Sequence, residues 1–403
     1  MPNTAAHTLP HNSQRLKVLC AGIASLILML GIARFAYTPM LPLMQQQAGL
    51  GIAQGGWLAA FNYVGYFCGA LIAANISDLA KKDRLYRLGL VVALVSTMGL
   101  GLTQNFWLWS VLRFFSGLSS AAGLLLGSGL VMHWLLRHQL RSELGIHFIG
   151  MGAGIFLTAL FVYLFADQIS WQHHWFWLTA LGSLLAIPAW FWLPKPDTSG
   201  YTVGGAKMID QPPSQQFLHT FMMAYFCAGV GYAVIITFIV AHVNQIAGHN
   251  EYGSVTFMII GLAAAPACII WDLVARKLGN LNALFLAFVL QFFGMLIPIL
   301  SPGLIWTFVG AALFGGTFIG IVSLVLTMAG RYFPTRPAKM MGKMTLSYGV
   351  AQMAAPAVVG ILAQWSGSYY LSIIIACGIM FVGCWLIYGL RSQDTPNPAH
   401  QPN

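Results

Sequence analysis

Long apolar runs with very few charges constrain this chain more than any other feature. Of its 403 residues, 58% are hydrophobic and 7% are charged, whereas soluble domains are about 25% charged. So few charges cannot cover the surface of a soluble fold of this length. Each helical span of a bilayer needs about 20 apolar residues, which leaves room for about a dozen spans. The sequence therefore predicts an all-α multi-pass membrane protein and excludes soluble, disordered and fibrous classes.

Twelve apolar stretches bounded by polar or turn residues predict twelve transmembrane helices. In chain order the predicted helices are Val18–Met44, Gly55–Asn75, Leu85–Thr103, Phe106–Leu136, Leu144–Ala166, Trp175–Leu193, Phe217–Ile246, Ser254–Ala275, Leu281–Leu300, Leu304–Tyr332, Met340–Trp365 and Tyr370–Leu390.

The positions of the basic residues predict how these helices are oriented. Of the 19 Lys and Arg residues, 17 lie in the N-terminal segment, in alternate connections and the helix ends beside them, or in the C-terminal segment. The two exceptions are Arg34 and Arg113. The other connections carry Asp167 and Glu251. Segments rich in Lys and Arg stay in the cytoplasm. We therefore expect both termini in the cytoplasm, in a bacterial inner membrane. The same asymmetry accounts for the formal charge of +10 without a nucleic-acid partner.

One long polar connection, rich in Pro, Gly, Ser and Gln, divides the chain into two halves. It predicts a six-helix bundle over residues 1–193, a cytoplasmic linker over 194–216 and a second six-helix bundle with a short tail over 217–403. The fifth and eleventh predicted helices are both rich in glycine, which permits close packing of membrane helices. Two similar halves that rock against each other are typical of secondary transporters.

Several motifs resemble those of the major facilitator superfamily. Arg113-Phe-Phe-Ser-Gly117 resembles its Arg-x-x-x-Gly motif, and the string from Gly31 to Pro42 resembles the YbfB/YjiJ-like branch of uncharacterised transporters. In the connection between helices two and three, Asp78, Lys81, Lys82 and Arg84 resemble a third motif of the superfamily, whose glycines are replaced here by Asn75 and Lys81. The resemblance implies the major facilitator fold, alternating access and a central cavity lined by helices one, four, seven and ten. It names no solute.

The resemblance also implies a cytoplasmic gate. Its first-half members are Asp78, Lys81, Lys82 and Arg84. In the corresponding connection of the second half, Arg276 stands where the superfamily pattern has an aspartate. We expect Asp272, one helical turn earlier, to take that role.

Arg34 and Arg113 are the two cations that lie deep within predicted helices, away from the helix ends. A charge near the bilayer centre costs ~3 kcal/mol and is functional by default. At 1.5 Å per residue the two lie at comparable depth, and no predicted span contains a deep Asp or Glu. Because a guanidinium can hold a carboxylate bidentately, we predict a small organic anion as the solute. For either arginine, the alternative is a packing or gating role in which it hydrogen-bonds neighbouring carbonyls.

Neutral polar residues provide further candidates for substrate binding. Tyr37 follows Arg34 at a spacing that places both on one face of an α-helix. The other predicted binding residues are Asn62, Tyr232, Thr317 and Gln352, with Tyr63, Tyr66, Thr237 and Tyr348 as additional candidates. Interhelical packing is the alternative for each of them.

The sequence contains no nucleotide-binding glycine loop, so transport is secondary or facilitated unless a separate ATPase subunit exists. Proton coupling needs a titratable group, and His147 and His242 are the candidates, with packing as the alternative for both. We expect a monomer that uses no cofactor and no metal.

Three other functions remain open. A multidrug or lipophilic-cation efflux antiporter would need an intramembrane carboxylate, which the predicted spans lack. A membrane enzyme would need a cluster of catalytic or ligating side chains, and the pair His173-His174 is the single cluster of this kind. A sensor or scaffold would not need a deep cationic site.

Overall fold

The computed structural model describes residues 12–76, 78–138, 144–196, 212–246, 252–301, 303–332 and 337–391. Most of the predicted linker, residues 197–211, lies outside this part of the chain. The described residues form helices and no strands. In chain order the helices are α1 (Asn12–Leu26), the π-helix η1 (Ile27–Phe35), α2 (Tyr37–Ala48), α3 (Ile52–Asn75), α4 (Leu79–Leu102), α5 (Phe106–Ala121), the π-helix η2 (Ala122–Gly127), α6 (Ser128–Arg137), α7 (Leu144–Phe165), α8 (Trp171–Phe191), α9 (Gln215–Gln245), α10 (Tyr252–Leu278), α11 (Asn280–Leu300), α12 (Leu304–Tyr332), α13 (Pro337–Ser366) and α14 (Tyr370–Arg391).

Within the described ranges these helices make twelve passes through the bundle, in the predicted order. The first pass joins α1, η1 and α2, and the fourth joins α5, η2 and α6. By length and hydropathy, eleven of the passes in this part of the chain are suited to cross a membrane. The pass that falls short is α8, because Gln172, His173 and His174 occupy its first turn.

Some helices extend beyond their apolar stretches. α4 begins at Leu79 rather than at the predicted Leu85, because the Asp78 carboxylate accepts hydrogen bonds from the backbone N–H groups of Ala80 (2.8 Å) and Lys81 (3.3 Å). Such a cap satisfies the N–H groups that a helix start leaves unpaired. Hydropathy therefore located the helix, and side-chain capping set its start.

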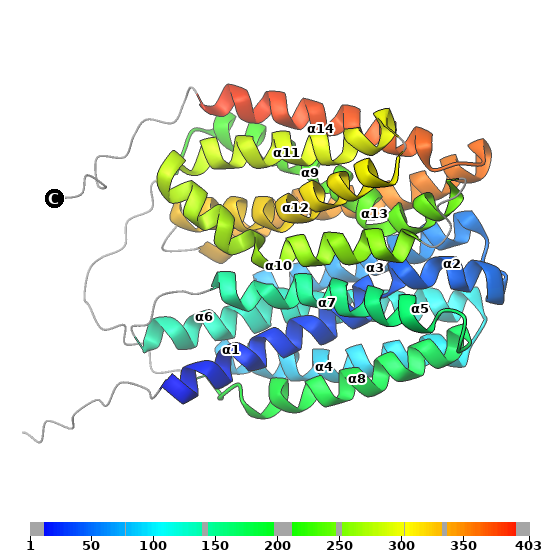
Figure 1. Cartoon of the computed structure of the whole chain (residues 1–403). Helices are drawn as coiled ribbons and strands as arrows, with labels where there is room; N and C mark the ends of the chain where they lie inside the picture. The colour runs from blue at the N-terminus through cyan, green and yellow to red at the C-terminus, as the bar shows by residue number, and fades with distance from the viewer. Residues whose placement is uncertain are drawn as a thin grey trace, which may run out of the picture.

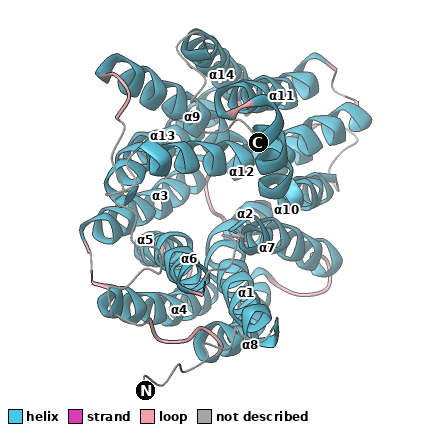
Figure 2. Ribbon diagram, turned by 90° about the vertical axis from the view of Figure 1, so that its left-hand side faces the viewer, coloured by secondary structure: helices cyan, strands magenta, loops and turns pink. Residues whose placement is uncertain are grey.

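The passes form two groups that lie against each other. In Figure 2, α1 to α8 fill the lower part of the molecule and α9 to α14 the upper part. The two groups meet along α7 with α10 and along α3 with α13. In Figure 1, α1 begins and α14 ends at the same end of the bundle, here termed the α1 end, and α2 reaches the opposite end, here termed the α2 end.

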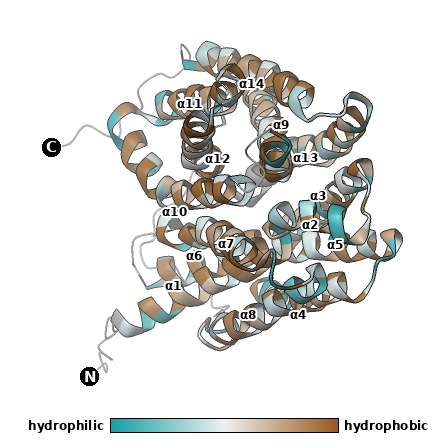
Figure 3. Ribbon diagram, turned by 45° about the vertical axis from the view of Figure 1, so that its right-hand side comes forward, coloured by the Kyte–Doolittle hydropathy of each residue, from teal (hydrophilic) through white to brown (hydrophobic). Residues whose placement is uncertain are grey.

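Apolar side chains cover the outside of the bundle as well as its interior. Hydrophobic residues predominate along most of the helices in Figure 3. Among the side chains that point outward, Phe191 and Ile305 are 74% exposed. In water such a surface would aggregate, whereas in a bilayer it contacts lipid tails.

Glycines allow the two groups to approach at backbone distance. A methyl group on Gly56 of α3 would lie 2.6 Å from the carbonyl oxygen of Pro356 and 3.0 Å from Cα of Gly360, both in α13. A methyl group on Gly152 of α7 would overlap the backbone nitrogen of Ala265 in α10. These contacts require glycine and are typical of membrane helix packing.

Candidate functional site

The first pass changes helix type at its centre. Residues Ile27–Phe35 form the π-helix η1, and the Ala36 N–H continues the wider pattern by donating to the Gly31 carbonyl (2.8 Å). From α5, the Ser120 hydroxyl donates to the Met29 carbonyl of η1 (2.7 Å). π-Helical turns are rare in proteins, and those that occur often lie at functional sites. The last turn of η1 carries Arg34.

Arg34 is buried between the two groups of helices, with 5% of its side chain exposed. Its Nη2 donates to Oε1 of Gln352 in α13 at 3.3 Å. Its guanidinium carbon lies 4.4 Å from the ring centre of Tyr66 and 4.7 Å from that of Tyr63, both in α3. These rings provide cation–π contacts. Within the described residues its Nε has no hydrogen-bond partner.

Arg113 is also buried, and its contacts are of a different kind. Its Nη1 reaches the carbonyls of Ala33 (3.3 Å) and Arg34 (3.5 Å), and its Nε reaches the carbonyl of Leu58 (3.4 Å). Its guanidinium carbon lies 4.2 Å from the ring centre of Tyr37. The two arginines therefore lie at the same depth, but Arg113 ties α5 to η1 and α3 as the packing alternative describes.

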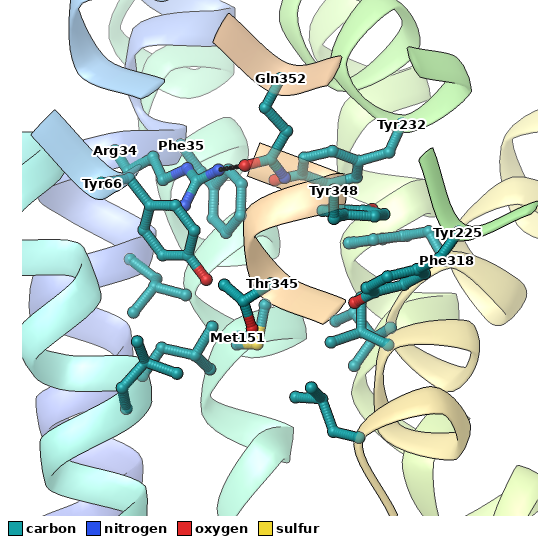
Figure 4. A pocket seen from close by; sticks show the side chains of 16 residues that line it. Arg34, Phe35, Tyr66, Met151, Tyr225, Tyr232, Phe318, Thr345, Tyr348 and Gln352 are labelled. Atoms are coloured by element: carbon teal, nitrogen blue, oxygen red, sulfur yellow. Dashed lines mark hydrogen bonds between the residues drawn. The ribbon is translucent and has the colours of Figure 1, made fainter. Parts of the chain in front are cut away.

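A cavity of about 40 Å³ lies beside Arg34, between the two groups of helices (Figure 4). Arg34, Phe35 and Tyr66 form one side, Tyr225, Tyr232, Phe318 and Tyr348 form the other, Gln352 lies between them, and Met151 and Thr345 line the α1 end. Among the described residues that line it, Arg34 is the one charged side chain. The volume suffices for roughly three water molecules, whereas ligand pockets measure about 300–1,000 Å³. The cavity is therefore contracted in this conformation.

The cavity is closed toward the α2 end. There the Thr38 hydroxyl donates to the Ile236 carbonyl of α9 (2.6 Å), and the hydroxyls of Tyr63 and Thr237 lie 3.3 Å apart. On the other side of Arg34, the cavity lining continues toward the α1 end through Leu30 and Leu326. The two groups of helices are thus joined between Arg34 and the α2 end, and they leave space between Arg34 and the α1 end.

Three of the predicted binding residues line the cavity, namely Arg34, Tyr232 and Gln352. Two of the additional candidates, Tyr66 and Tyr348, line it as well. Tyr37, Asn62 and Thr317 instead bond within the helix framework. The Tyr37 hydroxyl donates to the Gly55 carbonyl (2.8 Å), and Nδ2 of Asn62 donates to the Arg113 carbonyl (3.0 Å). The Thr317 hydroxyl bonds back to the carbonyl of Leu313 in its own helix (2.8 Å).

Tyr37 does not share a site with Arg34, although their spacing predicts one helical face. That prediction assumed an uninterrupted α-helix. The π-helical turn that ends at Phe35 and the turn at Ala36 change the angular spacing between the two residues. Tyr37 consequently packs under Arg113, while Arg34 faces Gln352.

The predicted gate residues lie at the α1 end. Asp78 caps α4, Lys81 and Arg84 are exposed, and Lys82 is half-buried. In the second half, Asp272 and Arg276 form an exposed ion pair along α10, with Nη2 and Oδ2 2.5 Å apart.

A more buried ion pair in the first half was not predicted. Nε of Arg87 lies 3.0 Å from Oδ2 of Asp83, one turn apart in α4. The same guanidinium donates to the Leu193 carbonyl (3.1 Å) and to the Trp190 carbonyl, so it links α4 to the end of α8. Their i,i+4 spacing is the sequence signal that would have identified this pair.

The two histidines proposed for coupling lie apart from the cavity lining. His147, in the first turns of α7, is fully buried, and its Nε2 lies 2.8 Å from the hydroxyl of Ser128. His242 lies near the end of α9 and is also buried. Neither is among the described residues around the cavity. The described part of the chain contains no group of three or more potential metal ligands.

The side of the cavity opposite Arg34, here termed the aromatic wall, is formed by Tyr225, Tyr232, Phe318 and Tyr348, and only half of it was predicted from the sequence. Tyr232 and Tyr348 were candidates, whereas Tyr225 and Phe318 were not. The available signal is helical periodicity: Tyr225 and Tyr232 are seven residues apart in α9, and Tyr348 and Gln352 are four apart in α13, so each pair shares a face.

Replacing Arg113 by alanine is expected to weaken the fold. The substitution removes charged hydrogen bonds from α5 to η1 and α3, and we expect a loss of about 3 kcal/mol in the free energy of unfolding. Denaturation in mixed detergent micelles measures it. Arg391→Ala, which removes a guanidinium bonded to Asn282 at the α1 end, is the matched control and should cost under about 1 kcal/mol. Equal losses in both variants would contradict the structural role of Arg113.

The chain is similar to known transporters in its sequence. Residues 26–388 match the model of the family described as "Uncharacterised MFS-type transporter YbfB". The uncharacterised MFS-type transporter YceJ of Bacillus subtilis is 32% identical over 24% of this chain and 25% of its own length. The cis,cis-muconate transport protein of Acinetobacter baylyi is 24% identical over 38% of this chain and 37% of its own length. The matches thus span 25% and 37% of these relatives' lengths.

The fold itself has a close counterpart among solved structures. A crystal structure of a mutant of the nucleoside transporter NupG superposes with a TM-score of 0.72, covering 93% of this chain and 99% of that one. The two sequences are 11% identical. At that identity the likeness concerns the arrangement of helices alone.

Proposed function

Because the chain belongs to the family of uncharacterised MFS-type transporters typified by YbfB, we propose that it carries a small organic anion by alternating access. The members of this family are membrane transporters and not enzymes. One observation carries the choice of substrate class. Arg34 lies in the central cavity, buried and without an acidic partner among the described lining residues. A buried cation without a counterion is costly, and a bound carboxylate relieves that cost.

The bond between Arg34 and Gln352 suggests how binding is linked to movement. It joins η1 in the first half to α13 in the second half across the cavity. A carboxylate accepts more strongly from a guanidinium than an amide oxygen does. An arriving anion therefore displaces Gln352, which releases one connection between the halves and favours expansion of the cavity.

The remaining elements of the cycle follow from this proposal. The halves, residues 1–193 and 217–403, rock about the central cavity, with the α1 end in the cytoplasm of a bacterium and the protein a monomer in the inner membrane. The gate at that end comprises Asp78, Lys81, Lys82 and Arg84 in the first half and Asp272 with Arg276 in the second. If protons drive the cycle, His147 or His242 acts at a distance from the substrate.

An efflux antiporter for lipophilic cations has less support. Such a substrate favours a carboxylate in the cavity, and the described lining residues include none. The Acinetobacter baylyi relative is named for cis,cis-muconate, which is a dicarboxylate and so supports the anionic class without setting the number of carboxylates.

Counterflow in proteoliposomes tests the proposed function. Vesicles preloaded with one unlabelled compound from a panel of mono-, di- and tricarboxylates, sulfonates, amino acids and lipophilic cations are diluted into traces of the labelled compound. We expect transient accumulation of at least one organic anion above protein-free vesicles and none of the cations. Accumulation of lipophilic cations alone would contradict the proposal.

A further inference from the structure

We propose that the transported anion is a monocarboxylate carried on a flat aromatic ring, of the size of benzoate. This inference rests on the proposed function and specifies the substrate of the same site. It is drawn from the single charge of the cavity and from the aromatic side chains that face it.

The number of available cations sets the charge of the substrate. Arg34 is the one charged side chain among the described residues that line the cavity. The second deep arginine, Arg113, does not line it and donates to the carbonyls of Leu58, Ala33 and Arg34. A dianion would therefore bring one carboxylate into the cavity without a cation to meet it, and burial of an unpaired carboxylate is strongly unfavourable. A monoanion matches the site.

The wall opposite Arg34 is built from rings that contact one another. Tyr225 and Tyr348 are stacked, with ring centres 4.4 Å apart. Tyr232 continues the wall, with its ring centre 5.6 Å from Tyr348 and 5.3 Å from Phe318. The four residues come from α9, α12 and α13, and Figure 4 shows them on the side of the cavity opposite Arg34 and Tyr66.

The two sides together favour a planar solute. Tyr66 and Phe35 present rings on the Arg34 side, so aromatic surfaces bound the cavity from both halves of the protein. Aromatic pairs gain stacking or edge-to-face energy that a saturated ring of equal size does not. An aromatic monocarboxylate whose carboxylate binds Arg34 would place its ring between these surfaces. The contracted cavity must expand to admit it, which the displacement of Gln352 from Arg34 permits.

Titration of four ring-sized compounds against the purified full-length protein tests the inference. The probes are benzoate, cyclohexanecarboxylate as the non-planar monoanion, terephthalate as the dianion and benzamide as the neutral ring. We expect the Kd of benzoate to be about tenfold lower than that of cyclohexanecarboxylate. Terephthalate should bind at least about tenfold more weakly than benzoate, and benzamide should not bind measurably.

A wall variant separates the aromatic contribution from the charge. Tyr348→Leu should raise the Kd of benzoate about tenfold while leaving that of cyclohexanecarboxylate within about threefold. Phe318→Leu is the second wall variant should the first fail to fold. Tyr163→Leu, at an exposed tyrosine of α7, is the control and should change neither value.

The outcomes distinguish this inference from the proposed function. Equal affinities for benzoate and cyclohexanecarboxylate, both lost in Arg34→Ala, would overturn the aromatic substrate and leave the anion site intact. Preference for terephthalate over benzoate would overturn the monoanion. Binding of benzamide as tight as that of benzoate, or no binding of any carboxylate, would overturn the proposed anion site and this inference together.

Discussion

Replacing Arg34 by alanine is expected to abolish transport of the proposed organic anion while leaving a folded, membrane-inserted protein. The guanidinium is the single charge that the described cavity lining offers to a carboxylate. Truncation of one partner of a buried charged pair costs about 2–5 kcal/mol, so the substrate Kd should rise about 30-fold or more. Counterflow in proteoliposomes and titration of the purified protein measure the two effects.

The stability of the Arg34→Ala protein distinguishes this account from misfolding. Without substrate, Arg34 has Gln352 and two tyrosine rings as partners but no counterion. Its removal takes an uncompensated charge out of the bilayer, so the melting temperature should stay equal or rise. Arg34→Lys keeps the charge but loses the planar fork, and we expect intermediate transport. Undiminished counterflow in Arg34→Ala would refute the anion site.

The sequence predicted the architecture well because the architecture follows from hydropathy. A bilayer requires every span to be long, apolar and helical, so twelve apolar stretches predicted twelve passes in the right order. The same sparseness of charge identified Arg34 and Arg113 as the deep cations, and their common depth follows from counting residues along straight helices.

The separation of the two arginines into different roles could not be predicted. It depends on the π-helix at Ile27–Phe35, whose carbonyls accept from Arg113 and Ser120 of α5. Hydropathy is the same for an α-helix and a π-helix, so the pattern contains no signal for the change. The rotation that this turn introduces sets Arg34 toward Gln352 and Tyr37 toward Arg113.

The aromatic wall is a third kind of feature, which the sequence contains but does not reveal. Its members lie in three helices, and each helix is aromatic on other faces as well. Tyr348 and Gln352 share a face of α13, yet only the crossing of α3 and α13 brings that face opposite Arg34. Tertiary contact, rather than local pattern, selects which tyrosines form the site.

Closure of the α2 end depends on contacts that only glycine permits, and a bulky residue there is expected to stop the cycle. In Gly56→Leu the new side chain would occupy the position of the Pro356 carbonyl and the Gly360 backbone. It would hold α3 and α13 apart, so the conformation closed at the α2 end becomes inaccessible. The proposed alternating-access cycle passes through this conformation on every turnover, so we expect loss of counterflow. Gly56 does not line the cavity, so the Kd of the carboxylate should change by less than about threefold.

A matched glycine provides the control for that experiment. Gly378 of α14 has no atom within 4 Å of the position that a Cβ would take, so Gly378→Leu adds the same side chain without a steric conflict. It should retain counterflow near the level of the unmodified protein. Fluorescent labels can be placed on α3 and α13 where these helices reach the α2 end of the bundle. The distance between the labels should be longer in Gly56→Leu and unchanged in Gly378→Leu. Normal counterflow in Gly56→Leu would mean that close contact of α3 with α13 is not required for transport. Closure of the α2 end would then depend on the contacts that Thr38 and Tyr63 make with α9.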